Sequence, residues 1–221
     1  MKPADRKKVL IVDDHPVIRY GITQTVEQEP DMLVCGQAED VQGALEAVER
    51  LEPDVAVVDI SLKHSSGIEL IKQLRQRRPG LPVLVLSMHD ESLYAERALR
   101  AGARGYVTKA EPPERIVEGI RQILQGGVYV SDALGRRMLR VMVGGKPGSE
   151  VFLVDRLSDR EFEIFELIGQ GLPTREIAQR LQLSIKTVET HRERIKDKLK
   201  LDSAADLLKY AIRWGQFVRG G

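Results

Sequence analysis

This 221-residue sequence has a single cysteine, no long apolar run and a net charge close to zero. The single cysteine, Cys35, excludes a disulfide framework and a zinc site built from cysteines. No apolar stretch approaches the length of a membrane span, and the charged N-terminus has no apolar segment behind it. The formal net charge of +1 says nothing about partners, so charge has to be examined locally. We expect a cytoplasmic protein without a membrane partner.

The length suits two small domains better than one α/β unit, and the 42% apolar content is enough to form their cores. The clearest single feature is the apolar run at residues 55–58, which leads directly into Asp59. Such a run is typical of a strand buried on both faces of a parallel sheet. Asp59 would then lie at the carboxyl edge of the sheet, where open α/β folds bind ligands. The alternative is that Asp59 only caps the helix that follows.

The first half of the chain alternates between apolar strands and amphipathic helices. We predict strands at residues 8–12, 32–35, 55–59, 83–86 and 106–108. We predict helices from residue 16 and at 40–51, 67–77, 92–101 and 114–124, with apolar residues at helical spacing. This order predicts an α/β domain, a five-stranded parallel doubly wound sheet of the flavodoxin-like class.

Polar residues follow the ends of four predicted strands: Asp13 and Asp14, Asp59, Ser87 and Lys109. Because parallel strands in such a fold lead to one edge, we expect these side chains to converge. Three carboxylates raise one another's pKa, and a hard divalent cation such as Mg²⁺ relieves their repulsion. A carboxylate nucleophile, a metal, a hydroxyl and an amine are the groups that phosphoryl transfer to a carboxylate needs.

On these motifs the first domain resembles the receiver domain of two-component response regulators. The motifs are Val12-Asp13-Asp14-His15-Pro16, Val57-Val58-Asp59-Ile60, Leu86-Ser87 and Gly105-Tyr106-Val107-Thr108-Lys109. The resemblance implies that Asp59 is the phosphoacceptor. It also implies that Mg²⁺ is bound by Asp13, Asp14, Asp59 and the backbone carbonyl of Ser61. Lys109 would contact the phosphoryl group. Ser87 and Tyr106 would form a switch pair, in which the hydroxyl moves toward the phosphate and the ring follows it inward.

Two positions depart from the usual receiver pattern. Lys63 and His64 occupy the loop after Asp59, where the family usually has proline. Ala110 follows Lys109, where many members have proline, so a cis Lys-Pro bond is not available. The first departure alters the loop over the site and the second leaves the following geometry open. We expect His15 and His64 to be solvent-facing loop residues and not ligands.

The second half of the chain reads as a connector and an all-helical domain. We predict a linker helix at residues 132–143, followed by a flexible Gly-rich tether at 144–149. Four helices follow, at about 158–169, 175–181, 184–199 and 203–214, the first opened by a capping box at Ser158 and Glu161. Thr174 and Ser184 are the predicted N-caps of the next two helices, which fit a helix-turn-helix.

The third of these helices is basic. Residues 184–200 contain six basic and three acidic residues, which leaves a local net charge of +3. A capped basic helix in this position suggests insertion into the DNA major groove with basic flanks on phosphates. The alternative is an ordinary solvated amphipathic helix, because charge runs are usually that.

Residues 155–217 resemble the LuxR-type DNA-binding domain. The motifs are Leu157-Ser158-Asp159-Arg160-Glu161, Gly171-Leu172-Pro173-Thr174-Arg175-Glu176-Ile177-Ala178 and Lys186-Thr187-Val188-Glu189-Thr190-His191. The resemblance implies base contacts from Glu189, Thr190 and Glu193, and phosphate contacts from Lys186, Thr187, Arg192, Arg194, Lys196 and Lys198. It implies a dimer face on the last helix, at Ala204, Leu207, Leu208 and Ala211. His191 is expected to pack or to contact the DNA backbone.

Together the two domains make the chain similar to NarL/FixJ-type response regulators. The expected division is a receiver at 7–126, a linker with a helix at 127–154 and a LuxR-type domain at 155–221. The expected protein is a transcription factor, not a turnover enzyme. In it, phosphorylation of Asp59 by a sensor histidine kinase relieves masking of the recognition helix and allows homodimers to bind double-stranded DNA and act with RNA polymerase. Two alternatives stay open: a phosphohydrolase that forms an aspartyl phosphate, and a constitutive DNA binder.

Overall fold

The computed structural model of the chain describes residues 6–62, 65–88, 91–142, 153–154 and 156–219. The chain forms two compact units, Met1–Gly135 and Arg136–Gly221. The predicted loop residues Lys63 and His64 and the predicted tether at 144–149 lie outside the described residues. The domain limits predicted from the sequence stay a prediction. None of the described helices combines the length and apolarity needed to span a bilayer.

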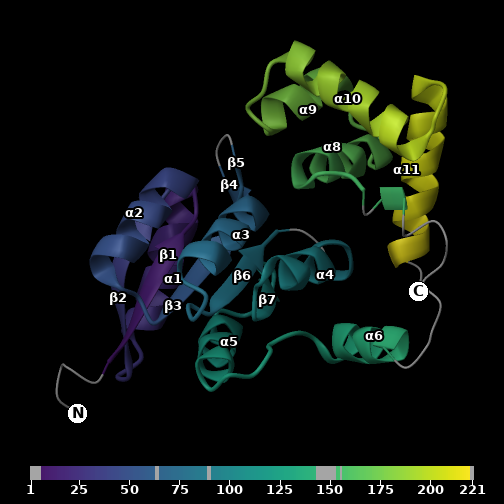
Figure 1. The fold of residues 1–221 in the computed structure, drawn as a ribbon. Helices are drawn as coiled ribbons and strands as arrows, with labels where there is room; N and C mark the ends of the chain where they lie inside the picture. The colour runs from purple at the N-terminus through teal and green to yellow at the C-terminus, as the bar shows by residue number, and fades with distance from the viewer. Residues whose placement is uncertain (1–5, 63–64, 89–90, 143–152, 155, 220–221) are drawn as a thin grey trace. The chain divides into compact units, whose positions relative to one another are not determined.

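The first unit is built on a five-stranded sheet of order β2-β1-β3-β6-β7, in which every neighbouring pair is parallel (Figure 1). The strands are β1 (Lys7–Val12), β2 (Met32–Ala38), β3 (Val55–Asp59), β6 (Val83–Ser87) and β7 (Gly105–Thr108). The helices are α1 (Pro16–Glu27), α2 (Val41–Leu51), α3 (Gly67–Arg77), α4 (Glu91–Ala101) and α5 (Glu114–Leu124). The predicted five-stranded parallel sheet with intervening helices is confirmed.

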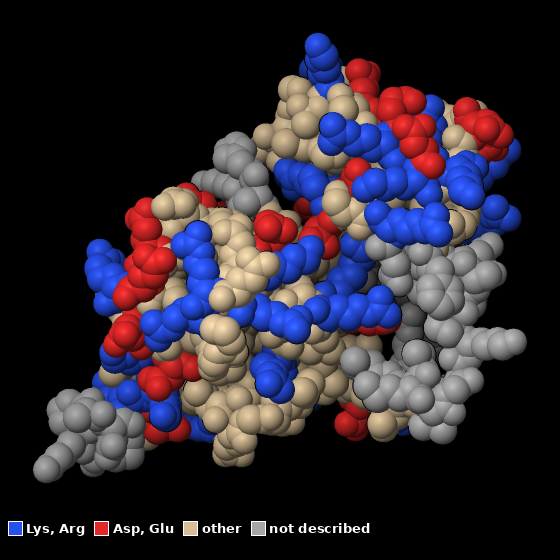
Figure 2. Space-filling view, in the orientation of Figure 1, with Lys and Arg blue, Asp and Glu red and all other residues tan. Residues whose placement is uncertain are grey.

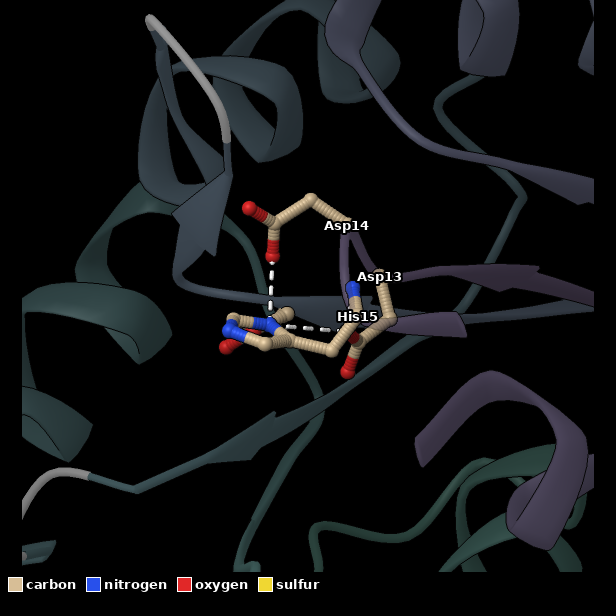
Figure 3. Close-up of side chains that lie close together, drawn as sticks. Asp13, Asp14 and His15 are labelled. Carbon is tan, nitrogen blue, oxygen red and sulfur yellow. Dashed lines mark hydrogen bonds and ion pairs between the residues drawn. The ribbon is translucent and has the colours of Figure 1, made fainter. Parts of the chain in front are cut away.

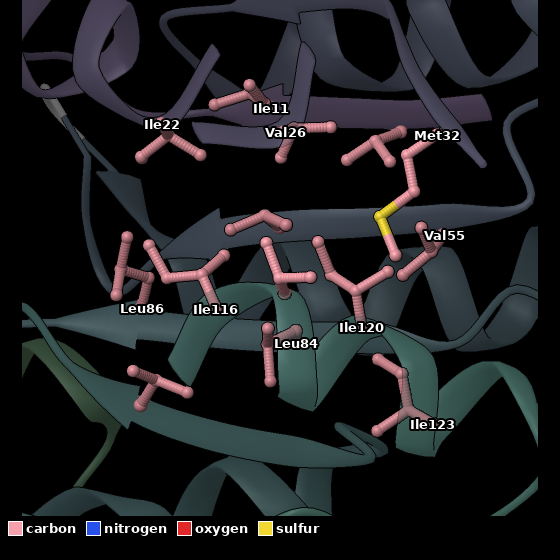
Figure 4. Close-up of a cluster of buried hydrophobic side chains, with 14 residues drawn as sticks. Ile11, Ile22, Val26, Met32, Val55, Leu84, Leu86, Ile116, Ile120 and Ile123 are labelled. Atoms are coloured by element: carbon pink, nitrogen blue, oxygen red, sulfur yellow. The ribbon is translucent and has the colours of Figure 1, made fainter. Parts of the chain in front are cut away.

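Successive residues of each central strand point to opposite faces of the sheet and are buried on both. One face carries Val9 and Ile11 of β1 into a cluster with residues of α1 and α5 (Figure 4). Leu10 and Val12 alternate with these residues along β1. They are also buried, but they do not belong to that cluster. Because both faces are covered, only the ends of the strands are open for polar groups.

One local feature differs from the sequence prediction, and a second adds to it. The segment after Asp59, expected to be a plain loop, forms a small antiparallel hairpin of β4 (Ser61–Leu62) and β5 (Ser65–Ser66). The segment after α5 returns to the sheet, because Tyr129 forms a parallel bridge beside Gly105. Its backbone N–H donates to the carbonyl of Arg104 (2.9 Å), and its carbonyl accepts from the N–H of Tyr106 (2.8 Å).

The second unit is helical, as predicted. Its helices are α8 (Asp159–Gly169), α9 (Thr174–Arg180), α10 (Ile185–Leu199) and α11 (Ala204–Arg219), and α6 (Asp132–Met142) crosses the division between the units. Trp214 of α11 packs edge-on against Phe162 and Phe165 of α8, with ring centroids 5.3 and 5.6 Å apart. These contacts join the first and last helices of the unit around one aromatic core.

The predicted caps hold for two of the three helices. Ser158 and Glu161 form the expected capping box, and the Ser184 side chain accepts from the Thr187 N–H. Thr174 is not the N-cap of α9: Pro173 occupies that position without a side-chain bond, and Thr174 is the first helical residue. The last helix is also longer than predicted and continues past Trp214 to Arg219.

Candidate functional site

Four strands of the first unit end at one edge of the sheet and bring together the polar residues expected there. Asp13, Asp59 and Ser87 are fully buried, and Asp14 is 8% exposed. Asp13, Asp14, His15 and Asp59 each offer a ligand atom, and these atoms all lie within 4.8 Å of one another. The convergence expected for the three carboxylates is therefore present in the structure.

Lys109 is the counter-charge in this cluster. It follows β7, and its N–H donates to the carbonyl of Ser87 (2.7 Å), which ties the end of β7 to the end of β6. Its side chain is 5% exposed, and Nζ lies 2.5 Å from Asp59 Oδ2 and 2.7 Å from Asp13 Oδ2. Burial lowers the pKa of Lys109, but the Asp59 and Asp13 carboxylates outweigh it and raise the pKa above its ordinary value. The amine therefore stays charged beside both carboxylates.

The pKa of Asp59 lies well above its ordinary value. Burial raises its pKa to about 6, because removal from water disfavours the charged form. Lys109 lowers the pKa and Asp13 raises it, so the neighbouring charges partly offset each other. The N–H of Ser61 donates to Asp59 Oδ1 (3.2 Å) and favours the ionised form. At neutral pH the carboxylate is mostly ionised and thus able to act as a nucleophile.

Gly67, the first residue of α3, allows the backbone at Asp59 to lie close to the helix start. A Cβ atom at residue 67 would sit 1.9 Å from the carbonyl oxygen of Asp59. The Gly67 N–H also donates to the carbonyl of Ile60 (2.7 Å). Any side chain at this position would therefore push away the backbone that carries Asp59.

Arg19 of α1 is a site neighbour that the sequence reasoning missed. Its Nη1 donates to the backbone carbonyl of Asp13 (2.5 Å), and its Nη2 lies 2.7 Å from Glu39 Oε1. The guanidinium thus links the end of β1 to the segment after β2. A basic residue one turn into α1 was the available signal, but helical pattern alone does not show where its side chain goes.

His15 is solvent-facing, as expected, but its imidazole also contacts two carboxylates of the site. Its side chain is 60% exposed, but Nδ1 lies 2.6 Å from Asp14 Oδ1 and 3.4 Å from Asp13 Oδ1 (Figure 3). Its backbone N–H donates to Asp13 Oδ1 (2.8 Å), which fixes the turn out of β1. The imidazole is therefore exposed, as expected, and its contact with the cluster is a feature that the sequence did not indicate.

The cluster is suited to a divalent cation. Three carboxylates are buried here, and the Lys109 amine contacts two of them, Asp13 and Asp59. Asp14 Oδ1 is buried and accepts no hydrogen bond among the described residues. Buried acceptors of this kind call for a proton, a water or an ion. An acidic, oxygen-rich site of this composition is typical of Mg²⁺ binding.

The expected switch residues are both buried. Ser87 is the last residue of β6, and Tyr106 of β7 is 2% exposed. Ser87 pairs with Thr108 and Tyr106 pairs with Val85 in the register of β6 and β7. In this structure the tyrosine ring is therefore already in the inward position.

In the second unit, α9 and α10 form the helix-turn-helix. Lys186, Glu189, Thr190, Glu193 and Arg194 are exposed on α10, whereas Val188, Ile195 and Leu199 are buried. Figure 2 shows Lys and Arg side chains interleaved with Asp and Glu on the visible face of the helical unit, not a surface of one sign. The predicted base-reading residues Glu189, Thr190 and Glu193 are thus exposed, and basic and acidic side chains alternate on this surface.

Several of the residues on α10 that were predicted to contact DNA phosphates contact side chains of the helical unit. Lys198 Nζ lies 2.6 Å from Oε2 of Glu161, a buried residue of α8, and Lys196 Nζ lies 2.8 Å from Glu193. The Thr187 hydroxyl lies 2.7 Å from that of Ser184. Arg192 is half-buried. Lys198 consequently serves the packing of α10 on α8.

His191 is half-buried on α10. Its Nδ1 is buried and has no hydrogen-bond partner among the described residues. Burial is the main cause that lowers its pKa, although Glu161 raises it. The position of the ring fits the expectation that His191 packs within the unit.

The predicted dimer residues on α11 divide into two sets. Leu207 and Ala211 are buried in the core of the unit, so their side chains do not face a partner. Ala204 and Leu208 are exposed, and Ile212, which the sequence reasoning did not select, is 37% exposed. These three residues recur every fourth position and form a stripe on one side of α11.

Two family models match the chain. The response regulator receiver domain matches residues 9–121, and the luxR family of bacterial regulatory proteins matches residues 155–211. Among similar proteins, the transcriptional activator protein ExaE of Pseudomonas putida is 36% identical and the response regulator GacA of Pseudomonas aeruginosa is 34% identical. Each of the two alignments covers 94% of this chain and 96% of the relative. The oxygen regulatory protein NreC of Staphylococcus haemolyticus is 34% identical over 93% of this chain and 97% of the relative.

Solved structures give the same result. RcsB from Salmonella enterica serovar Typhimurium, bound to the promoter P1flhDC in the presence of phosphomimetic BeF₃⁻, has a TM-score of 0.61 at 28% identity and covers 93% of this chain and 98% of its own. A LuxR-family response regulator from Aurantimonas has a TM-score of 0.58 at 33% identity and covers 62% of this chain and 99% of its own. The chain therefore belongs to the NarL/FixJ-type two-component response regulators, with a receiver domain followed by a LuxR-type DNA-binding domain.

Proposed function

We propose that Asp59 accepts a phosphoryl group from a sensor histidine kinase, and that phosphorylated Asp59 promotes sequence-specific DNA binding by α10. The observation that supports this most directly is the contact of Lys109 Nζ with both Asp59 and Asp13 at the sheet edge. One charged amine beside a buried carboxylate nucleophile is the arrangement that binds a phosphoryl group and stabilises its transfer.

The transfer follows from the charges of the site. An oxygen of ionised Asp59 attacks phosphorus while the bond from phosphorus to the donor breaks, and the electron pair leaves with the donor. Lys109 exchanges its contact with Asp59 Oδ2 for one with the phosphoryl oxygens, and Asp13 keeps the amine in place. Asp13, Asp14, Asp59 and the Ser61 carbonyl are the proposed ligands of Mg²⁺, which neutralises phosphoryl charge when bound. The same groups support self-phosphorylation from small phosphodonors and slow autodephosphorylation.

The output is a shift between two states of the receiver domain. Ser87 moves its hydroxyl toward the phosphoryl group, and the inward position of Tyr106 is the state that phosphorylation favours. The two residues lie on the adjoining strands β6 and β7. The buried Tyr106 ring in this structure corresponds to the favoured state.

DNA binding uses the exposed side of α10 in the major groove. Glu189, Thr190 and Glu193 face the bases, and Lys186, Thr187, Arg192, Arg194 and Lys196 contact phosphates. Homodimers form through Ala204, Leu208 and Ile212 and bind two half-sites, and the bound dimer contacts RNA polymerase. Structures of RcsB bound to promoter DNA and of two RcsB dimers on two DNAs support this mode of binding.

The test compares DNA binding of the full chain with and without acetyl phosphate and Mg²⁺. Footprinting on genomic DNA first identifies the fragments that the protein protects. The fragment with the strongest protection is then used as the DNA probe. Wild type should bind about tenfold more tightly with acetyl phosphate, within the usual range of such couplings. Asp59→Asn should not respond, whereas Asp54→Asn, at the other end of β3, should respond as wild type.

Two results would change the proposal. Equal DNA binding in all conditions, without labelling of Asp59 by acetyl phosphate, would make the chain a constitutive DNA binder. Multiple turnovers of a small phosphate ester that depend on Asp59 would make it a phosphohydrolase. Intact-mass measurement of the phosphorylated chain, alongside the binding assay, distinguishes these outcomes.

A further inference from the structure

The inference concerns His15 and its contact with the carboxylates of the site. Figure 3 shows the imidazole ring between the side chains of Asp13 and Asp14. Its Nδ1 lies 2.6 Å from Asp14 Oδ1 and 3.4 Å from Asp13 Oδ1. The two carboxylates are almost fully buried, whereas the His15 side chain is 60% exposed. The potential metal ligands of the cluster therefore include the Nδ1 atom of His15 as well as carboxylate oxygens.

Asp14 contributes a buried oxygen atom to this contact. Asp14 Oδ1 accepts no hydrogen bond among the described residues, and His15 Nδ1 lies 2.6 Å away. A buried acceptor of this kind calls for a proton, a water or an ion. An ion bound by Asp14 Oδ1 would also lie close to His15 Nδ1.

The spacing of the donor atoms leads to the same conclusion. With metal–ligand bonds of about 2.1 Å, neighbouring ligands of an octahedral ion are about 3 Å apart and opposite ligands about 4.2 Å apart. Nδ1 lies 2.6 and 3.4 Å from its two carboxylate oxygens, and all four candidate ligand atoms lie within 4.8 Å of one another. One ion at the centre of the cluster is therefore within bonding range of Nδ1 after small movements of the side chains.

We propose that His15 is a direct ligand of the metal and gives this site a preference for later first-row transition dications, such as Co²⁺ or Ni²⁺, over Mg²⁺. Mg²⁺ prefers oxygen ligands and water, whereas imidazole suits transition metals. The inference rests on the proposed function, because it concerns the metal of the same site. It goes beyond that function by assigning a fourth side chain and a different class of ion.

The test uses calorimetric titration of the full, metal-free chain with Co²⁺ and with Mg²⁺ at fixed pH, and NMR of the Co²⁺ form. Wild type should bind Co²⁺ more tightly and show paramagnetically shifted imidazole resonances. His15→Ala should lose these resonances and about tenfold or more of the Co²⁺ affinity, a loss typical around metal sites. Its Mg²⁺ affinity should change little. His64→Ala, His89→Ala and His191→Ala cover the other three histidines of the chain and should match wild type.

The outcomes separate the two proposals. If His15→Ala keeps the ratio of Co²⁺ to Mg²⁺ affinity and the shifted resonances, His15 is not a ligand, but the Mg²⁺ site stands. If wild type and Asp14→Asn bind neither ion measurably, the metal site itself fails, and the role of His15 fails with it. Loss of the shifted resonances in one of the control variants would assign the nitrogen ligand to that histidine and overturn the inference.

Discussion

Lys109 Nζ lies 2.5 Å from Asp59 Oδ2, and the same atom lies 2.7 Å from Asp13 Oδ2. One amine therefore bridges two carboxylates that follow different strands, β1 and β3. The contact couples the proposed phosphoacceptor to the proposed metal ligand, and it also compensates two buried charges. Removing the amine should affect both activity and stability.

Lys109→Met keeps the bulk of the side chain but leaves two buried carboxylates without their cation. We expect the free energy of unfolding of the metal-free chain to fall by about 3 kcal/mol at neutral pH, as for other broken buried pairs. Labelling by acetyl phosphate should fall at least about tenfold, because the amine no longer stabilises the transferred group. Urea unfolding and intact-mass measurement check these effects. Lys72→Met on the exposed side of α3 is the matched control, and similar labelling of both variants would contradict the role of Lys109.

The pKa of Asp59 predicts a pH dependence of stability. Burial raises this pKa from 3.8 to about 6, so between these values the carboxyl is protonated in the folded chain and ionised in the unfolded chain. The folded state then binds the extra proton, and stability falls as pH rises through this window and levels off above about 6. Asp59→Asn removes this loss and should stabilise the metal-free protein by about 1–3 kcal/mol at pH 7.5.

Urea unfolding in the presence of a chelator, at several pH values from 4 to 8, measures this effect. Wild type and Asp59→Asn should differ little at pH 4 and diverge toward pH 6. Asp202→Asn, an exposed residue of the helical unit, is the control and should follow the wild-type curve. If the free energy of unfolding changes with pH in the same way for wild type and Asp59→Asn, ionisation of the buried Asp59 does not destabilise the folded chain.

Arg19 is predicted to position Asp13 without touching the phosphoryl group. Arg19→Ala removes the donor to the Asp13 carbonyl and the pair with Glu39, which should cost about 1–2 kcal/mol of stability. We expect Mg²⁺ affinity to fall several-fold, because the segment after β1 is held less firmly. Titration with Mg²⁺ measures this, and Arg50→Ala on the exposed end of α2 is the control. Unchanged Mg²⁺ affinity together with lower stability would assign Arg19 a purely structural role.

Arg194 and Lys198 separate phosphate contact from packing on α10. Arg194→Ala should weaken DNA binding on all sequences and reduce the slope of log affinity against log salt by about 1. Lys198→Ala should leave that slope nearly unchanged, because its amine is paired with Glu161. It should instead lower the stability of the helical unit by about 1–3 kcal/mol, since the buried Glu161 loses its partner. Equal salt slopes for the two variants would contradict this division.

The sequence predicted the sheet and most of the site for one physical reason. Strands buried on both faces have long apolar runs, and in a parallel sheet their carboxyl ends meet at one edge. Asp13, Asp59, Ser87 and Lys109 follow such runs, so their convergence could be inferred from position alone. The capping box at Ser158 and the serine cap at Ser184 were predictable because they depend on residues three positions apart.

Other features depend on side-chain directions and on contacts that no short pattern encodes. Arg19 and His15 contact Asp13 through particular rotamers, and neither contact has a signature in the sequence. The choice between Leu207 and Leu208 as surface residues required the position of α8 against α11. Thr174 was assigned as a cap because threonine favours that position, but the backbone begins the helix one residue earlier, after Pro173.

The bridge between Tyr129 and Gly105 has a practical consequence for work with isolated fragments. β7 ends the strand order of the sheet, and Tyr129 satisfies the N–H of Tyr106 on its outer side. A fragment truncated at residue 126 would leave that amide unpaired and offer an open strand edge for pairing with other molecules, a common origin of aggregation. A fragment that ends at Gly135 would keep the edge closed and is the better choice for crystallisation and NMR.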